Sequence, residues 1–377
     1  MMTTPCAPTI NGKPYANGNA NANGGAVAVA PKVTLPSVPL SASTLRKLEQ
    51  IKRLSDSIAA LPSLYPCEEV NSLFGALVNA CIDADAEEEE VSQQLHALIR
   101  FFEIRHHHHH NMNHRGGRII NNIDGNNSNL NLNGGLTHFL LPSAADRQNL
   151  IVNCAEAETL MEKDFALRLG AMASEDEILE ALQKFRFIRN YEKLTRLEYH
   201  LLLGQEEFSN LSGLRNVAFV GSGSLPLTTF FLVEGLLPNK AVVTNYDIDG
   251  DSNSVAKRWM HALPALRDRV EFKTADILDV PEEELRRYDV IVLAALVGLV
   301  PKMKLRILQH LRRGMKEGSY LLLRSAEGAK AFLYPVVEMG DLRGWNVCSV
   351  THPKGEVVNS VIVVTKRIDS VQDPMWV

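Results

Sequence analysis

The sequence predicts an α/β fold for the second half of the chain and an all-helical domain before it. Two observations carry this prediction. After Val217, short apolar runs alternate with helical patterns, whereas residues 45–104 and 142–203 show mainly helical periodicity. Alternating strands and helices are typical of a parallel sheet covered on both faces. From these patterns we expect three regions: a disordered tail over 1–42, a helical domain over 43–212 and an α/β domain over 213–377.

The composition excludes several classes of protein. With 45% hydrophobic residues and a formal net charge of −5 over 377 residues, the chain has no basic footprint for nucleic acid. It has no apolar stretch of the roughly 18 to 20 residues that span a bilayer, and its N-terminus does not resemble a secretory signal. The five cysteines are scattered without a Cys-x-x-Cys pair, which is typical of reduced thiols. We therefore expect a cytoplasmic protein with neither nucleic-acid nor membrane partners.

Helix signals mark the first domain. Ser41–Thr44 supplies an N-cap for a helix whose apolar residues recur at three- and four-residue spacing: Leu45, Leu48, Ile51, Leu54 and Ile58. Further helices are expected over Glu68–Cys81 and from Glu88 to about Ile104. After residue 142 the helical pattern resumes, with a capping box over Ser174–Glu177 and a helix end at Gly204.

The amino-acid composition changes abruptly inside this helical domain, over about residues 105–140. A run of five histidines precedes an Asn- and Gly-rich stretch there. Imidazole binds Zn²⁺, Ni²⁺ and Cu²⁺, but a flexible repeat lacks the fixed geometry of a proper site. We interpret the segment as a disordered insertion and predict no metal site.

The strands of the α/β domain are read from short apolar runs. They are expected over residues 217–220, 241–246, 269–273, 288–294, 318–324, 345–351 and 357–365. The last two are predicted to form an antiparallel hairpin through the turn His352–Glu356. Seven strands with that ending resemble the sheet of a Rossmann-like, class I methyltransferase-like domain.

The turn after the first strand points to a cofactor. Gly221 and Gly223 let the backbone approach a ligand closely and adopt positive φ. A dinucleotide-binding turn has a third glycine at the position that Pro226 occupies in this chain. Proline instead suits the first turn of a helix. A cofactor without a pyrophosphate, S-adenosylmethionine, fits this departure. The alternative interpretation is a doubly wound α/β domain that binds no cofactor.

Acidic residues at later strand ends support the same cofactor. Asp247 can accept hydrogen bonds from both ribose hydroxyls, and Asp276 is placed to meet the adenine amino group. Ala294 leaves room at the mouth of the fourth strand. The predicted cofactor-binding residues are Gly221, Ser222, Gly223, Leu225, Pro226, Asp247, Asp249, Asp276, Ile277 and Ala294.

Five segments in order resemble the nicotianamine synthase family. They cover most of residues 45–104 and 146–365, and they read LPSLYPCEEVNSLFGALVNACI, NYEKLTRLEY, AFVGSGSLPLT, NYDIDGDSN and LAALVG…LLLRSAEGAKAFLYPVVE. The resemblance implies condensation of three S-adenosylmethionine molecules by aminocarboxypropyl transfer. An amine attacks the γ-carbon, methylthioadenosine leaves, and a final step closes an azetidine ring. The implied product chelates Fe, Zn, Cu and Ni, and no metal is implied for catalysis.

The resemblance also implies catalytic residues. The family's tyrosine in NYxKL matches Tyr191, and its catalytic glutamate matches Glu158 or Glu162, which share a helical face. We favour Glu162 on its spacing to Tyr191. Without the resemblance, a solvated helix charge is the better interpretation of either glutamate. A half-buried packing side chain accounts for Tyr191 equally well.

Two further residues are candidates for substrate binding. Arg324 ends a strand and can bind a carboxylate through its bidentate fork, and Tyr334 can line the pocket. The chain departs from the family nearby, with Glu327 for the usual histidine and Ala329-Lys330 for Pro-Arg. His352 is interpreted as structural.

Three alternatives remain open at this level. A related transferase that makes an opine-type or shorter product would use the same cofactor. A small-molecule N-methyltransferase would share the fold, because one fold supports many chemistries. The histidine run suggests a third class, a metal-binding protein without catalysis.

Overall fold

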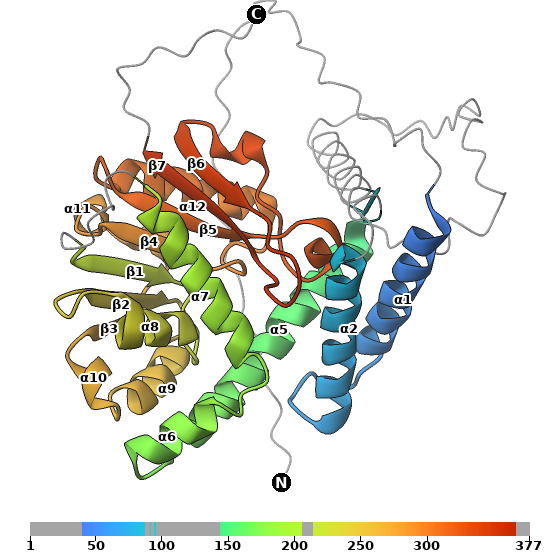
Figure 1. Ribbon diagram of the computed structural model, residues 1–377, viewed down its shortest axis with the longest axis horizontal. Coiled ribbons are helices and arrows are strands. Elements are labelled where there is room, and N and C mark those ends of the chain that lie inside the picture. Colours follow the sequence, from blue (N-terminus) through green and yellow to red (C-terminus); the bar gives the residue numbers. More distant parts are fainter. Residues whose placement is uncertain (1–39, 87–90, 92–93, 96–143, 206–213, 367–377) are drawn as a thin grey trace, which may run out of the picture. The chain divides into compact units, whose positions relative to one another are not determined.

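A seven-stranded sheet organises the second half of the chain, and helix α7 of the first half packs against it (Figure 1). The computed structural model describes residues 40–86, 91, 94–95, 144–205 and 214–366, all within one compact unit. The strands are β1 Asn216–Val220, β2 Val242–Asp247, β3 Val270–Thr274, β4 Val290–Leu293, β5 Tyr320–Ser325, β6 Trp345–Thr351 and β7 Ser360–Lys366, in the spatial order β3-β2-β1-β4-β5-β7-β6. The predicted α/β fold is confirmed.

The sheet is parallel except at its β7–β6 edge. β7 pairs antiparallel with both β5 and β6, so the predicted hairpin is confirmed. The predicted last strand began at residue 357, but β7 begins at Ser360, and Val358 and Asn359 line a pocket. Elsewhere the strand bounds shift by no more than two residues, and β6 has the predicted bounds.

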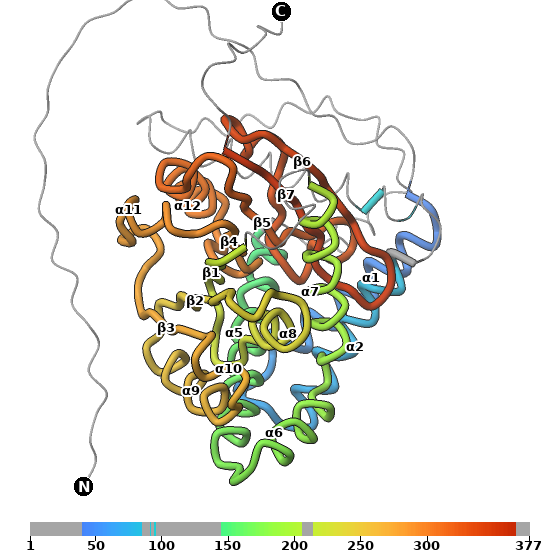
Figure 2. Tube along the Cα trace, turned by 60° about the vertical axis from the view of Figure 1, so that its left-hand side comes forward, coloured from blue at the N-terminus to red at the C-terminus, as the bar shows by residue number. Residues whose placement is uncertain are grey.

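The alternation along β1 shows why the sheet is covered on both faces. Val217 and Phe219 belong to one buried cluster, while Ala218 and Val220 belong to another. Strands buried on both faces are typical of parallel sheets. The first cluster includes α7 Ile188–Leu203, α8 Leu227–Phe231, α9 Gly250–Met260 and α10 Pro264–Arg267. The second includes α11 Glu282–Leu285 and α12 Pro301–Gly314, as Figures 1 and 2 let the reader follow.

A third buried cluster joins the first helices to the C-terminal half. It combines α1 Ala42–Ala59, α2 Glu68–Ala86 and α5 Ala144–Leu169 with the 3-10 turn Gly328–Phe332. The long α5 contacts α1, this turn and α9, so it passes from the helical half to the sheet. The predicted boundary at residue 212 lies outside the described residues, and the two-domain division stays a prediction.

Most of the helix caps lie at the residues that the sequence predicts. Ser41 Oγ accepts from Thr44 N and begins α1, and Gly204 ends α7, as predicted. Ser174 Oγ accepts from Glu177 N at the start of α6 Glu175–Leu182. The Glu177 carboxylate, however, accepts from Ala173 N, so the predicted capping box is only half formed. The tail, the His-rich insertion and most of the predicted helix after Glu88 lie outside the described residues.

A buried ion pair attaches α7 to the sheet. Arg324 of β5 donates from Nε and Nη2 to the two oxygens of Glu198, at 2.7 and 2.9 Å. Nη2 also donates to Thr228 Oγ1 of α8, at 2.6 Å. The side chains of Arg324 and Glu198 are only 5% and 2% exposed. One guanidinium therefore fixes one strand and two helices.

Replacing Glu198 by Gln is expected to cost about 3–5 kcal/mol of unfolding free energy, because it leaves the Arg324 charge buried and uncompensated. Urea unfolding measures the loss. The control is Glu356→Gln, which removes the charged partner of Lys193 in an exposed pair between the β6–β7 loop and the same helix α7. That change should cost less than about 1 kcal/mol. Equal losses in the two variants would contradict a structural role for the buried pair.

Candidate active site

The glycine turn after β1 is held in a conformation that other residues rarely adopt. Gly221 has φ of 77°, and a Cβ there would lie 2.1 Å from Val297 Cγ2. Gly221 N and Ser222 N both donate to Tyr246 O, at 2.8 and 3.2 Å. Gly223, with φ of 65°, donates its N–H to Asp247 Oδ2 at 2.8 Å. The turn is thus pinned to the end of β2.

One buried polar side-chain atom of this turn makes no hydrogen bond to the described residues. Ser222 is 5% exposed, and its Oγ has no hydrogen-bond partner among the described residues. Buried hydroxyls are normally paired, so an unpaired one beside a glycine turn suits a site that a polar ligand completes. The turn therefore fits the predicted cofactor.

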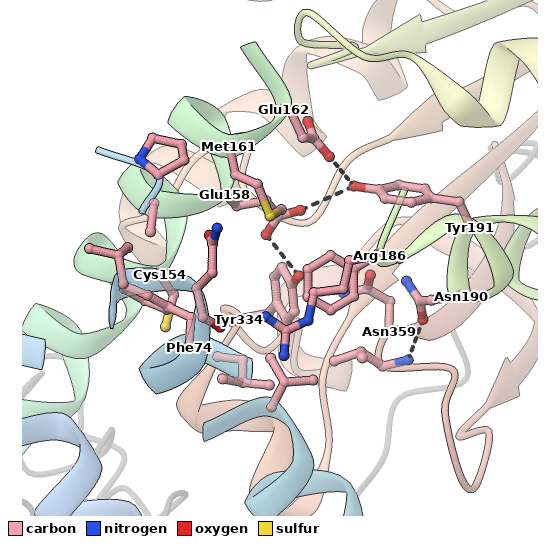
Figure 3. A pocket seen from close by; sticks show the side chains of 18 residues that line it. Phe74, Cys154, Glu158, Met161, Glu162, Arg186, Asn190, Tyr191, Tyr334 and Asn359 are labelled. Atoms are coloured by element: carbon pink, nitrogen blue, oxygen red, sulfur yellow. Dashed lines mark hydrogen bonds between the residues drawn. The ribbon is translucent and has the colours of Figure 1, made fainter. Parts of the chain in front are cut away.

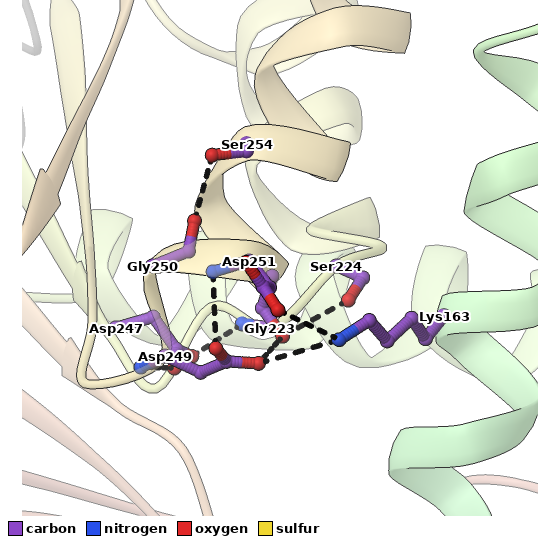
Figure 4. A network of polar contacts seen from close by, with 9 residues as sticks. Lys163, Gly223, Ser224, Asp247, Asp249, Gly250, Asp251 and Ser254 are labelled. Atoms are coloured by element: carbon purple, nitrogen blue, oxygen red, sulfur yellow. Dashed lines mark hydrogen bonds and ion pairs between the residues drawn. The ribbon is translucent and has the colours of Figure 1, made fainter. Parts of the chain in front are cut away.

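The acidic residues form a network beside the turn, drawn in Figure 4. Asp247 Oδ1 accepts from Asp249 N at 2.9 Å, and Asp249 caps α9 by accepting from Asp251 N. Hydrogen bonding to Ser252 lowers the pKa of Asp249. Lys163 Nζ of α5 lies 3.7 Å from Asp249 Oδ2 and 4.0 Å from Asp251 Oδ2. α5 thus reaches the cofactor side of the sheet.

The remaining predicted cofactor residues gather nearby. Asp276 follows β3, next to Ala275, whose N–H donates to Asp247 O at 3.0 Å. The Asp276 carboxylate accepts from Leu278 N at 2.9 Å and so caps the turn that contains Ile277. Ala294 Cβ lies 3.3 Å from the position of a Cβ on Gly221. Leu225, Pro226 and Ile277 are buried.

Four side chains form a hydrogen-bonded chain on the other side of the turn, shown in Figure 3. The Tyr191 hydroxyl of α7 lies 2.6 Å from Glu162 Oε1 and 3.1 Å from Glu158 Oε1. The Tyr334 hydroxyl lies 2.8 Å from Glu158 Oε2. Both glutamates stand on α5, one turn apart. The structure therefore brings together all three predicted catalytic residues and the predicted pocket residue Tyr334.

Burial dominates the electrostatics of this chain. Burial, followed by the neighbouring charge of Glu158, raises the pKa of Glu162 to about 8, against the hydrogen bond from Tyr191 and the charge of Arg324, which lower it. Burial likewise raises the pKa of Glu158, against the hydrogen bonds from Tyr334 and Tyr191, which lower it. Both tyrosines have pKa values well above the ordinary value. At neutral pH the tyrosines are neutral and Glu162 is poised to exchange a proton.

Glu162 connects this chain to the cofactor turn. Its Oε2 lies 3.5 Å from the position of a Cβ on Gly223, and its side chain also lines a pocket. The pocket is lined by Pro66, Val70, Asn71, Phe74, Val78, Cys154, Ala157, Glu158, Met161, Glu162, Arg186, Phe187, Asn190, Tyr191, Leu333, Tyr334, Val358 and Asn359. Glu162 therefore faces both the turn and the pocket.

The pocket has polar groups that sequence analysis missed. Asn359 is 7% exposed, and its Nδ2 has no hydrogen-bond partner among the described residues. Asn190 Oδ1 accepts from Val358 N at 3.1 Å and holds the hairpin loop against α7. Arg186, also on the lining, donates to Asn71 O of α2. No local motif marks these residues, because their roles come from contacts between distant segments.

Arg324 lies away from the pocket lining, with both fork nitrogens bonded to Glu198. Its predicted contact with a substrate carboxylate stays a prediction, and the pair it makes now is structural. Sequence analysis missed Glu198, which lies 126 residues away.

The residues that depart from the family pattern brace the hairpin loop. Lys330 Nζ donates to Pro353 O at 2.7 Å and to Val357 O at 2.9 Å. Glu327 lies 2.8 Å from His352 Nδ1, which also contacts Ser360 Oγ at 2.9 Å. His352 thus has structural contacts, in agreement with its interpretation.

The described part of the chain contains no group of three His, Cys, Asp or Glu side chains that could hold a metal ion. It also contains no helix that is long and apolar enough to cross a membrane. The histidine run lies outside it.

Comparison with known proteins identifies relatives. The family model described as nicotianamine synthase protein matches residues 140–371. Probable nicotianamine synthase 4 of Arabidopsis thaliana is 37% identical over 323 residues, covering 85% of this chain and 82% of the relative. A mutant of MtNAS in complex with S-adenosylmethionine has a TM-score of 0.59 at 18% identity, covering 85% of this chain and 97% of that chain. MtNAS in complex with MTA and tNA has a TM-score of 0.55 at 20% identity, covering 84% and 97%. At these identities the solved structures show a shared fold.

Gly221→Ala is expected to destabilise the fold and weaken S-adenosylmethionine binding, because its Cβ meets Val297 and positive φ strains alanine by about 1–3 kcal/mol. Gly318→Ala is the matched control, since Gly318 has φ of 72° and no atom within 4 Å of an added Cβ. Urea unfolding and calorimetric titration with S-adenosylmethionine measure both effects. If the two variants lose equal stability and bind equally, close packing at Gly221 is unimportant.

Stability is expected to fall as the pH rises from about 4.5 towards 8. The folded pKa of Glu162 is about 8, above its ordinary value of 4.5, so the folded state holds a proton that the unfolded chain has released. Glu162→Gln removes this term, and its melting temperature relative to wild type should increase across that pH window. Glu156→Gln, an exposed change on the same helix, should follow wild type. A constant difference between Glu162→Gln and wild type would rule out the raised pKa.

Proposed function

The chain belongs to the nicotianamine synthase family, and we propose that it condenses three S-adenosylmethionine molecules into nicotianamine. S-Adenosylmethionine is a substrate here, because it donates its aminocarboxypropyl group at each step. Methylthioadenosine is released each time, and ring closure completes the azetidine. The MtNAS complexes with S-adenosylmethionine and with MTA and tNA support this proposal.

The bond changes define what the protein has to supply. An amine nitrogen forms a bond to the γ-carbon of the methionine moiety while the bond from that carbon to sulfur breaks. The sulfonium leaves as the neutral thioether of methylthioadenosine, and the amine loses one proton. Because the sulfonium is already a good leaving group, the protein needs mainly to orient the reactants, exclude water and accept that proton.

The position of Glu162 carries the proposal. Its carboxylate lies between the cofactor turn at Gly223 and the pocket, so an amine in the pocket can lose its proton there while attacking a bound cofactor. The hydrogen bond from Tyr191 orients the carboxylate. We assign Glu162 as the general base and Tyr191 as the residue that orients it. The raised pKa makes this carboxyl group a stronger proton acceptor whenever it is ionised.

The other site residues divide between the two reactants. Asp247 and the glycine turn would hold the ribose and the methionine part of the donor, and Asp276 would meet the adenine. In the pocket, the unpaired Nδ2 of Asn359 and the guanidinium of Arg186 suit the carboxylate of the acceptor. The role of Arg324 is then to fix α7, and with it Tyr191.

The product gives the proposal its biological context. Nicotianamine carries amine and carboxylate groups that chelate Fe, Zn, Cu and Ni, which places the chain in metal homeostasis. We propose a cytoplasmic enzyme without nucleic-acid or membrane partners, as the sequence predicts.

Incubation with S-adenosylmethionine alone, followed by mass spectrometry, tests this function. We expect methylthioadenosine and nicotianamine in a ratio of three to one. Methylthioadenosine that forms only when histidine is added would indicate an opine-type enzyme. S-Adenosylhomocysteine would indicate methyl transfer, and either outcome overturns the proposal.

In the same assay, Glu162→Gln and Tyr191→Phe are expected to lower turnover, by about 10²- to 10⁴-fold for loss of the base. Tyr199→Phe on the same helix is the control, because Tyr199 does not line the pocket. It should leave turnover unchanged. Full activity in Glu162→Gln would disprove the assignment of the base.

A further inference from the structure

The hydrogen-bonded chain of four side chains contains more contacts than its tyrosines have protons. The relay group, defined as Glu162, Tyr191, Glu158 and Tyr334, has three oxygen–oxygen contacts of 2.6, 3.1 and 2.8 Å. Each such contact needs one hydrogen between the two oxygens, because two bare oxygens repel each other. The two hydroxyls supply only two hydrogens, and one hydroxyl hydrogen cannot point straight at two acceptors.

From this count we propose that the relay group holds one further proton, shared between Glu158 and Glu162 through the Tyr191 hydroxyl. The inference rests on the proposed function only for its use, not for the proton count. It gives the two glutamates different roles, although they stand one turn apart on α5. Glu162 is the base that faces the reactants, and Glu158 stores the proton.

Two arrangements of the hydrogens satisfy all three contacts. In the first, protonated Glu158 donates to Tyr191 Oη, and Tyr191 donates to ionised Glu162. In the second, protonated Glu162 donates to Tyr191, and Tyr191 donates to ionised Glu158. Tyr334 donates to Glu158 in both. Shifting two hydrogens along these bonds moves the negative charge between the glutamates without ionising a tyrosine.

The surroundings favour a single negative charge. Two buried carboxylates that share a site resist losing both protons. The charged or titratable groups that act on them include Arg324 on β5, Asp247 on β2 and Cys154 on α5, and Arg186 lines the same pocket while it donates to Asn71 O. Arg324 supplies one positive charge, although Glu198 already neutralises it in part. One carboxylate is therefore tolerated and two are opposed.

The stored proton keeps Glu162 ready for successive transfers. With the proton on Glu158, Glu162 is ionised and accepts the proton that the amine loses as the bond from nitrogen to the γ-carbon forms. Both glutamates are then protonated, so one proton must leave to solvent before the next transfer. The group thus takes up one proton per transfer and never needs to carry two charges.

Infrared spectroscopy at neutral pH tests the proton count directly. A protonated carboxyl group has a C=O stretch separate from that of a carboxylate, and ¹³C-labelled glutamate distinguishes Glu from Asp. We expect one protonated glutamate per wild-type chain. Glu158→Gln and Glu162→Gln should each lose this band completely, because the Gln amide supplies the third hydrogen and leaves the other glutamate ionised.

Glu156→Gln, an exposed change on α5, is the control and should keep the band. No band in wild type, bands for two protonated glutamates, or a band that survives in either Gln variant would overturn the proposal. Melting curves of each variant show that it is folded. The measurement needs no turnover, so it separates failure of the shared proton from failure of the proposed function, which the product assay reports.

Discussion

The burial of one arginine sets the geometry of the site. Arg324 holds Glu198, and Glu198 lies seven residues after Tyr191 on α7, which puts both on the same face of that helix. Fixing Glu198 on the sheet therefore fixes the Tyr191 hydroxyl two turns away. Thr228 extends the same contact to α8, which follows the glycine turn. The cofactor turn and the tyrosine of the pocket are thereby tied to one guanidinium.

The acidic side chains of the site lower the free energy of unfolding of the chain that surrounds them. Glu158 and Glu162, each with a pKa raised mainly by burial, cost free energy whenever the second of them ionises. The surrounding clusters have to offset that cost. The third buried cluster, which packs α1 and α2 against α5, keeps the helix that carries both glutamates in place. Such opposition between activity and stability is common where a carboxyl group has to remain reactive at neutral pH.

Local patterns predicted much of this structure. The strand ends, the glycine turn and the caps at Ser41 and Gly204 depend on residues close in sequence. Tyr191 and the glutamates were found through a family motif, and helical spacing alone put Glu158 and Glu162 on one face. Glu198, Lys163 and Asn359 escaped prediction because each acts on a partner in another segment. The Arg324 fork had a recognisable chemistry, but only the fold reveals that Glu198 occupies it.

The loop between β6 and β7 forms one wall of the pocket without belonging to the sheet. Val358 and Asn359 line the pocket, while Lys330 holds the carbonyls of Pro353 and Val357 from behind. Lys330 and Glu327, which contacts the loop through His352, are two of the three positions, with Ala329, at which the sequence analysis noted a departure from the family pattern. This wall and the two glutamates of α5 therefore depend on different segments of the chain. A substitution in the loop can change the size and polarity of the pocket without moving the helix on the opposite side of its lining.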